Sequence, residues 1–495
     1  MTITERFGIN RKQGELDFID IDINKDLPLF IDPYRISKLS GPFINEANGI
    51  INNFFSYLIE LLVTKEYNKV NEIFVNFGEV NETCLGFSKN KPRGNGIGAK
   101  GAQDLLTAIK NSKAVDLGIL ESLEELLKLV SSSIFPPVSS YSFKSYNRIS
   151  DMTTNIIRKL LIEYTQEQCK IFNIPLVSDV ASGMYWDPNS RTWRQEYTEM
   201  LVIEGKRYLL VPKIIVTYGD KITSKDYYQH FVLNFLQSEN IRQKTDLVRY
   251  KKGKKNRGEV FVTKKDISEK QLKIQKGQSV SKDWLANFTS AHARVFRDFK
   301  EESFYKMKDV DYGENSEDIA KYLINKLKSI NTGNKDASEY HITMICILEF
   351  IFYPHISNPK KEVEINEGRK RIDIVFNNSS SNGFFFDLFE KYDIPANFIM
   401  VECKNYSTDV NNPELDQLLG RFSKHRGKFG ISTSRKAEDY KTLIKRCNDI
   451  YRDTDNLIIP LLDEDILSIL EEIANGKNNG LDLLLSKYTE IVFPQ

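Results

Sequence analysis

The chain has 495 residues, of which 41% are hydrophobic and 28% are charged, and its formal net charge at pH 7 is +1. One hydrophobic core rarely serves a chain of this length, so we expect two to four domains in an ordinary globular protein. Overall composition does not indicate a strongly basic nucleic-acid-binding chain, and any such surface must come from a local cluster of charge.

The sequence shows neither a signal peptide nor the cysteine pairs that are typical of secreted proteins. The N-terminus is polar and lacks the apolar segment of a signal peptide, and no apolar run has the length of a membrane-spanning helix. We therefore expect a cytoplasmic protein without a membrane partner. The cysteines are scattered without a Cys-x-x-Cys pair and predict reduced thiols rather than disulfides or a zinc site: Cys84, Cys169, Cys346, Cys403 and Cys447.

Residues 1–135 are predicted to form a mainly helical domain, with a long helix over residues 44–66. Residues 15–23 alternate acidic and apolar side chains, which indicates an amphipathic strand with a solvent-exposed acidic face; a second metal site is the alternative. Residues 92–102 are rich in glycine and precede a predicted helix. Their backbone amides would suit a phosphate group, and a plain flexible turn is the alternative.

Residues 136–305 are predicted to form a middle domain. A helix is expected over residues 149–172 and a small β-meander over residues 184–218, where Trp186 and Trp193 fit core packing better than base stacking. The next segment holds the densest basic charge of the chain, which is typical of phosphate contacts with DNA; a solvated basic loop is the alternative. The candidate nucleic-acid-binding residues are Arg249, Lys251, Lys252, Lys254, Lys255 and Arg257.

Two predicted strands in the last domain, residues 316–495, carry the clearest candidate site. The strand around Asp373 and the strand around Glu402 are short and rich in β-branched and aromatic side chains, as buried strands are. Residues two apart on a strand share a face, so Glu402 and Lys404 project together. A charge in a buried strand is unfavourable unless a partner compensates for it.

We interpret the compensating partner as a divalent metal. Magnesium takes carboxylate oxygens, here those of Asp373 and Glu402, and activates a bound water that can attack phosphorus; manganese would serve in its place. Lys404 would then orient or deprotonate that water and offset charge on the phosphate. The alternative is a cross-strand ion pair on a solvated face of the sheet.

Asp373 with Glu402-Cys403-Lys404 resembles the PD-(D/E)xK signature of the restriction-endonuclease-like superfamily, with Ile372 where that signature has proline. The order of predicted elements also matches that family's core: a helix over 337–352, the two strands, a helix from residue 412, a strand over 428–434, a helix over 437–452 and a strand over 456–462. The similarity covers about residues 316–470 and is greatest to the Mrr-like branch.

The resemblance implies further site residues. Its helix before the Asp strand often supplies a Glu to the metal, for which we expect Glu339, with Glu349 as the alternative. A Gln on the helix after the Lys strand approaches the active site in this family, and Gln417 holds that place.

The predicted fold class is a multidomain α/β and α+β protein. It combines a restriction-endonuclease-like core with a central mixed sheet flanked by helices, a mainly helical N-terminal region and a small β-containing middle domain. The expected function is a magnesium-dependent endonuclease that cuts DNA in bacterial restriction or antiphage defence, as a homodimer or with a defence partner protein. A recombination or repair nuclease that recognises a DNA structure, or a non-catalytic DNA-binding scaffold, is the alternative.

Overall fold

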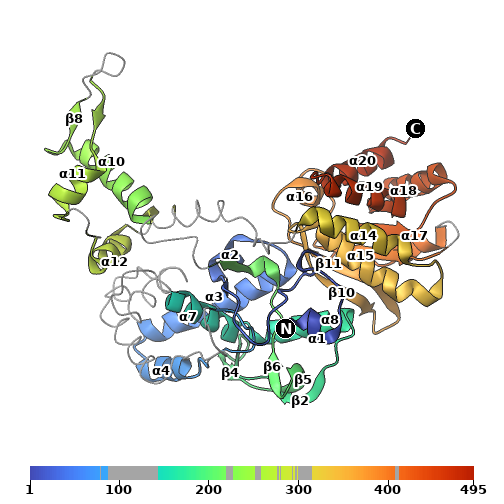
Figure 1. The fold of residues 1–495 in the computed structure, drawn as a ribbon, viewed down its shortest axis with the longest axis horizontal. Coiled ribbons are helices and arrows are strands. Elements are labelled where there is room, and N and C mark those ends of the chain that lie inside the picture. The colour runs from blue at the N-terminus through green and yellow to red at the C-terminus, as the bar shows by residue number, and fades with distance from the viewer. Residues whose placement is uncertain are drawn as a thin grey trace.

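The structure, a computed structural model, describes residues 1–78, 80–86, 143–218, 227–250, 258–275, 315–406 and 412–494, together with most of 278–298. The described elements gather around three main hydrophobic cores. We refer to them as the N-terminal unit (residues 1–218), the middle unit (residues 227–298) and the C-terminal unit (residues 315–494), which succeed one another in colour in Figure 1. The chain is thus a multidomain protein of mixed helices and strands.

The N-terminal unit packs its helices and short strands around one core. Its longest helix, α3, begins with Pro42 at the first helical position, and its buried side chains Ile51, Phe54, Phe55 and Leu58 recur every three or four residues. The elements in order are α1 (Ile3–Phe7), η1 (Gln13–Glu15), β1 (Leu29–Ile31), α2 (Pro33–Lys38), α3 (Pro42–Val63), α4 (Tyr67–Val75), α7 (Phe143–Ile156), α8 (Arg158–Ile171), β2 (Val177–Ala181), β3 (Tyr185–Asp187), β4 (Thr192–Arg194), β5 (Tyr197–Ile203), β6 (Lys206–Tyr208), η2 (Lys213–Ile215) and β7 (Val216–Tyr218).

The boundary predicted after residue 135 falls inside this core. Buried side chains from residues 3–84 and from residues 152–216 belong to one cluster, and β1 pairs with β7 across the predicted boundary. Trp186 and Trp193 are buried in that cluster with ring centroids 5.7 Å apart, in agreement with a packing role. The described residues 3–84 therefore bury their apolar faces together with residues 152–216.

Residues 15–23 form no strand, and the predicted exposed acidic face is wrong. Leu16 and Phe18 are buried, as alternation requires, but Glu15 and Asp17 are buried as well. Glu15 pairs with Arg11 at 3.2 Å, which supplies the compensation that an exposed carboxylate would obtain from water.

The middle unit has its own small core and stands apart at one end of the molecule (Figure 1). Its elements are the π-helical turn η3 (Tyr227–Val232), α10 (Leu233–Gln243), β8 (Arg249–Tyr250), β9 (Val260–Phe261), α11 (Lys264–Asp266), the π-helical turn η4 (Ile267–Gln271) and α12 (Lys282–Ala291). Strands β8 and β9 pair as an antiparallel hairpin. The basic segment of the sequence therefore includes strand β8, and its residues 251–257 lie outside the described residues.

The C-terminal unit is a five-stranded sheet in the order β10-β11-β12-β13-β14 with helices around it. Strands β10, β11 and β12 are antiparallel neighbours, whereas β12, β13 and β14 are parallel, so the sheet is mixed as predicted. The elements in order are α14 (Ser316–Ser329), η5 (Asn334–Asp336), α15 (Ala337–Phe352), β10 (Ile356–Ile365), β11 (Lys370–Asn378), α16 (Gly383–Glu390), β12 (Phe398–Lys404), α17 (Asn412–Leu419), β13 (Phe429–Ser434), α18 (Tyr440–Thr454), β14 (Leu457–Leu462), α19 (Asp463–Ala474) and α20 (Gly480–Val492).

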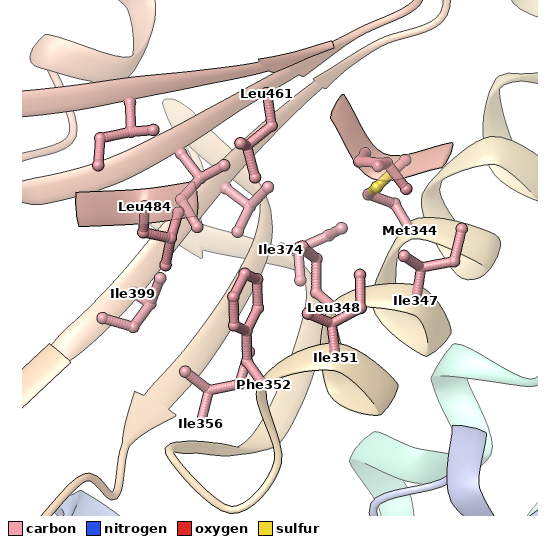
Figure 2. Packing of buried hydrophobic residues seen from close by; sticks show 14 of the residues in the cluster. Met344, Ile347, Leu348, Ile351, Phe352, Ile356, Ile374, Ile399, Leu461 and Leu484 are labelled. Carbon is pink, nitrogen blue, oxygen red and sulfur yellow. The ribbon is translucent and has the colours of Figure 1, made fainter. Parts of the chain in front are cut away.

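Helix α15 forms the centre of this unit's core. It is apolar on nearly all sides, and Met344, Leu348 and Phe352 belong to one buried cluster with side chains from the sheet such as Ile374 (Figure 2). A helix that is hydrophobic around its circumference must be covered on every side. The sheet covers one side, and α14 and the N-terminal unit contribute to the rest.

A buried polar seam joins the N-terminal and C-terminal units. Asp17 accepts hydrogen bonds from the Tyr164 hydroxyl at 2.6 Å and from the Asn358 backbone amide at 2.9 Å. Lys213 pairs with Glu349 at 3.0 Å, and both side chains are fully buried. These five residues, called the seam below, tie residues far apart in the sequence into one packed interface. Within the described ranges, no helix has the length and apolarity needed to cross a membrane.

Candidate active site

The candidate site lies where β11 and β12 separate. Their antiparallel ladder runs as far as the pair Ile374 and Val401. The next two positions, Asp373 and Glu402, therefore lie across from each other and project from the same face. Beyond the ladder, Asp373 Oδ2 accepts a hydrogen bond from the Cys403 backbone amide at 2.9 Å, so a side chain takes the place of a backbone acceptor. We call the site formed by Asp373, Glu402 and the Cys403 backbone amide the fork.

Glu402 is buried, and Lys404 pairs with only one of its two carboxylate oxygens. Its Oε1 atom lies 2.7 Å from Lys404 Nζ, whereas Oε2 is buried and has no hydrogen-bond partner among the described residues. Burial raises the pKa of Glu402, the Asp373 carboxylate raises it further, and Lys404 lowers it. The fork thus brings two carboxylates together in a place where their charges are poorly solvated.

Lys404 connects the fork to α17. Its Nζ atom donates to Gln417 Oε1 at 3.2 Å and lies 5.9 Å from the centre of the Tyr406 ring. Burial alone lowers the pKa of Lys404, but the ion pair with Glu402 and the charge of Asp373 outweigh burial and raise it. The structure therefore gathers four of the predicted residues, Asp373, Glu402, Lys404 and Gln417, into one cluster.

Small and basic side chains complete the surroundings. Glu402 and Lys404 lie beside Ser432 and Ser434 in the parallel ladder with β13, and all four residues are buried. Arg421 is buried near Glu402, lowers its pKa, and donates from Nε to the Arg371 carbonyl at 2.8 Å. The cluster therefore combines two carboxylates with two cations.

The two carboxylates fit a hard divalent cation such as magnesium, which often uses only one or two protein carboxylates. The unpartnered Oε2 of Glu402 is the observation that supports this fit. In the part of the chain that the structure describes, no group of three or more His, Cys, Asp or Glu side chains is placed to hold a metal ion. The predicted set of Asp373, Glu402 and a helix carboxylate is therefore not assembled.

Neither candidate helix carboxylate reaches the fork. Glu339 Oε1 lies 2.6 Å from Lys326 Nζ and 3.3 Å from Arg11, and Glu349 pairs with Lys213 in the seam. Lys326 lies on α14 of the same unit, whereas Arg11 and Lys213 belong to the N-terminal unit. Helix α15 therefore directs both carboxylates toward basic side chains of α14 and of the N-terminal unit. The structure thus places neither Glu339 nor Glu349 beside Asp373 and Glu402.

His341, which the sequence reasoning missed, is the α15 side chain that does approach the fork. Burial lowers the pKa of His341, and the nearby charge of Asp373 opposes this shift. The signal was available, because His341 falls on the same predicted helix as Glu339. Only the packing of α15 on the sheet shows which of these side chains faces the strands.

Most of the predicted nucleic-acid-binding residues lie outside the part of the chain that the structure describes. Lys251, Lys252, Lys254, Lys255 and Arg257 lie outside the described residues, as does the glycine-rich segment 92–102. Arg249 is described at the base of the β8–β9 hairpin, where it pairs with Asp266 at 2.6 Å. Its charge is therefore partly neutralised within the middle unit.

Comparison with known proteins adds one match. Residues 8–223 match the model of a family described as a domain of unknown function, DUF8370. The matched range has nearly the same limits as the N-terminal unit, whose described residues share one hydrophobic core. No curated protein and no solved structure matches the chain.

Proposed function

We propose that the C-terminal unit is a metal-dependent endonuclease that hydrolyses DNA phosphodiester bonds. The observation that carries this proposal is the fork, where Asp373 and Glu402 face each other beside Lys404. Within the described part of the chain, Glu402 Oε2 is buried there without a hydrogen-bond partner. An unpaired carboxylate oxygen beside a second carboxylate is costly unless a cation binds there. The mixed sheet with Asp373 and Glu402-Cys403-Lys404 on adjacent strands also supports a restriction-endonuclease-like core.

In this proposal each side chain has a distinct role. Asp373 and Glu402 hold a magnesium or manganese ion, and such an ion, when bound, supplies charge that activates water and neutralises the phosphate. Lys404 donates hydrogen bonds to the attacking water or to a phosphate oxygen. Gln417 keeps the Lys404 ammonium over the sheet through its 3.2 Å contact. The water oxygen forms a bond to phosphorus as the bond to the leaving sugar oxygen breaks.

DNA as the substrate, a role in bacterial restriction or antiphage defence, and a cytoplasmic location are parts of the same proposal. They rest on the resemblance of the motif and on the basic segment of the middle unit, which would contact the DNA backbone. A homodimer or a defence partner protein would bring a second site to the opposite strand. A nuclease of recombination or repair would use the same residues and differ in preferring branched DNA.

The ion pair at 2.7 Å between Lys404 and Glu402 favours one rival, a non-catalytic scaffold in which these charges only pair with each other. Plasmid cleavage with magnesium or manganese distinguishes the two functions. The intact protein should nick or linearise the plasmid, and Lys404→Ala and Asp373→Asn should abolish cleavage while circular dichroism spectra stay unchanged. Absence of cleavage by the intact protein with either metal, on plasmid and on branched DNA, would favour the scaffold.

A further inference from the structure

The end of helix α17 and the residues just after it contact both strands that form the fork. Gln417 accepts a hydrogen bond from Lys404 of β12 at 3.2 Å. Four residues further on, Arg421 Nε donates to the Arg371 carbonyl of β11 at 2.8 Å. Arg371 precedes Asp373 by two residues on the same strand. This short segment therefore lies across the opening between β11 and β12, and it brings Arg421 to the surroundings of the fork.

Arg421 is a buried cation without a carboxylate partner among the described residues. Only 8% of its surface is exposed, and within the described part of the chain only its Nε atom has a hydrogen-bond acceptor. By contrast, the buried Arg158 lies 2.9 Å from Glu82, and Lys404 lies 2.7 Å from Glu402. A buried charge is costly unless an ion of opposite sign pairs with it. The two terminal nitrogens of Arg421 are therefore suited to an anion that is not part of the described chain.

The guanidinium group of Arg421 is held in place and acts on the fork. Its N–H donors lie in one plane, so the bond from Nε to the Arg371 carbonyl also orients the two terminal nitrogens. Burial raises the pKa of Glu402, and the charge of Arg421 lowers it, which indicates that the two groups interact. A planar pair of donors matches an anion with several oxygen acceptors, such as a phosphate group.

We propose that Arg421 binds a phosphate group of the DNA through its two terminal nitrogens and so holds the DNA backbone beside Asp373 and Glu402. This inference rests on the proposed function, and it adds a substrate-binding residue to the proposed site. The phosphate supplies the anion that the buried guanidinium lacks. Because the contact is present in bound DNA before the water attacks, it contributes to substrate binding rather than to the chemical step.

Two substitutions separate phosphate binding from support of the β11 backbone. Arg421→Gln places an amide nitrogen where arginine has Nε, so it keeps a donor for the Arg371 carbonyl and removes the charge with both terminal nitrogens. Arg421→Lys keeps the charge but has a carbon in place of Nε. A role in backbone support alone predicts that Gln substitutes well and Lys poorly. Phosphate binding predicts the reverse.

Arg452→Gln is the matched control, because it removes the same charge from the same unit. The Arg452 side chain is 69% exposed and lies near the end of α18, shortly before β14 begins. Strands β12, β13 and β14 run parallel, so the start of β14 lies at the edge of the sheet opposite to the end of β12, where Lys404 is. Any effect of net charge alone should be equal in the Arg421 and Arg452 variants.

The main readout is binding of duplex DNA with magnesium, measured by fluorescence anisotropy in the Asp373→Asn background, which should not cleave. Arg421→Gln should weaken binding about 10-fold and make the slope of log affinity against log salt shallower by roughly 1. Arg421→Lys should weaken binding only a few-fold and keep the slope, because lysine is a point charge without the paired donors. Unchanged binding in Arg421→Gln, or an equal change in Arg452→Gln, would overturn the proposal. If Arg421→Gln does not fold, Arg421→Lys decides, and unchanged affinity in that variant would overturn the proposal.

Plasmid cleavage with magnesium supplies a second readout. Arg421→Gln should raise KM about 10-fold and leave kcat within a few-fold, as loss of a contact present in bound substrate does. A lower kcat at unchanged KM would overturn the binding role. If the intact protein cleaves no DNA but the anisotropy results are as expected, the proposed function fails and the phosphate contact stands. If the intact protein cleaves and Arg421→Gln binds DNA as tightly as before, the proposed function stands and this inference fails.

Discussion

Lys213 of the N-terminal unit lies 3.0 Å from Glu349 of the C-terminal unit, and the ion pair is buried on both sides. The ammonium group also lies 4.1 Å from the centre of the Tyr353 ring and near the Asp17 carboxylate. One cation therefore serves two buried carboxylates from different units. This ion pair links the N-terminal unit to α15, the helix on which His341 also lies.

Removing the cation should cost far more stability than removing the Glu349 charge. Above pH 8, where Glu349 is charged, Lys213→Met leaves Asp17 and Glu349 buried without a counter-ion, which should lower the free energy of unfolding by roughly 3–5 kcal/mol. Glu349→Gln leaves Lys213 with Asp17 and should cost less. Chemical denaturation measures both. Lys391→Met, which breaks an exposed pair with Asp387, is the control and should leave stability nearly unchanged.

The seam also predicts a pH dependence. Burial raises the pKa of Glu349 from its ordinary 4.5 to about 8, which Lys213 opposes and Asp17 reinforces. The folded protein therefore holds a proton that the unfolded chain releases between about pH 4.5 and pH 8. The stabilising contribution is complete below this range and is lost as the pH rises through it, by at most about 1.4 kcal/mol per pH unit.

Glu349→Gln tests this dependence. Unfolding free energies measured from pH 5 to pH 8 should fall less steeply in the variant than in the intact protein. Burial also raises the pKa of Asp17, so a smaller decline should remain in the variant. Parallel curves for the two proteins would show that Glu349 does not titrate in this range.

Asp373 has a structural and a proposed chemical role that two substitutions separate. Asp373→Asn keeps an oxygen to accept the Cys403 amide but removes the charge, so cleavage should be lost with little change in thermal unfolding temperature. Asp373→Ala also removes the acceptor and should lower stability by about 1–3 kcal/mol. Cleavage and thermal unfolding of the same preparations provide both measurements. Cleavage by Asp373→Asn at the intact rate would remove this residue from the proposed site.

The sequence predicted the elements whose periodicity is strong. The helix expected over residues 337–352 is found with those bounds as α15, because its apolar residues and Pro354 define it locally. Strand β10 was not predicted, since Pro359 and neighbouring charges interrupt its apolar pattern. It forms because β11 pairs with it and because Gln168 of α8 donates to the Pro359 carbonyl at 3.2 Å. Such contacts join residues too far apart for local patterns to reveal.

Contacts between distant residues also explain why the sequence located some side chains of the candidate site and not others. Alternation along one strand was enough to place Glu402 and Lys404 on one face, and the resemblance of the motif associated them with Asp373. The pairing of β11 with β12 brings Asp373 opposite Glu402. The roles of Glu339 and His341 depend on which side of α15 meets the sheet, and that side is fixed by the N-terminal unit. Residues 1–218 gave no local sign that they would bind this helix.

Gly41 marks another close contact between the two units. Its φ of +126° lies in a region that only glycine adopts readily, and a Cβ there would lie 2.8 Å from the Asn378 carbonyl oxygen. Gly41→Ala should therefore cost about 3 kcal/mol. Gly205→Ala is the control, because Gly205 also has a positive φ but nothing lies within 4 Å of its added Cβ, and it should cost nearer 1 kcal/mol. Equal losses in chemical denaturation would show that the contact with Asn378 is not tight.

The basic segment of the middle unit predicts the salt dependence of DNA binding. Replacing four lysines by Gln should weaken binding of duplex DNA at every sequence, and the slope of log affinity against log salt should become shallower by roughly 1 for each phosphate that is no longer neutralised. Fluorescence anisotropy at several salt concentrations measures both. The substituted residues are Lys251, Lys252, Lys254 and Lys255.

A control with the same change in net charge distinguishes local contact from general electrostatics. Four exposed lysines of the other units, replaced by Gln together, should lower affinity only slightly and leave the salt slope nearly unchanged. Suitable positions are Lys25, Lys65, Lys69 and Lys321. Equal effects of the two sets would mean that the basic segment makes no direct phosphate contacts, and DNA would then have to be held by the C-terminal unit itself.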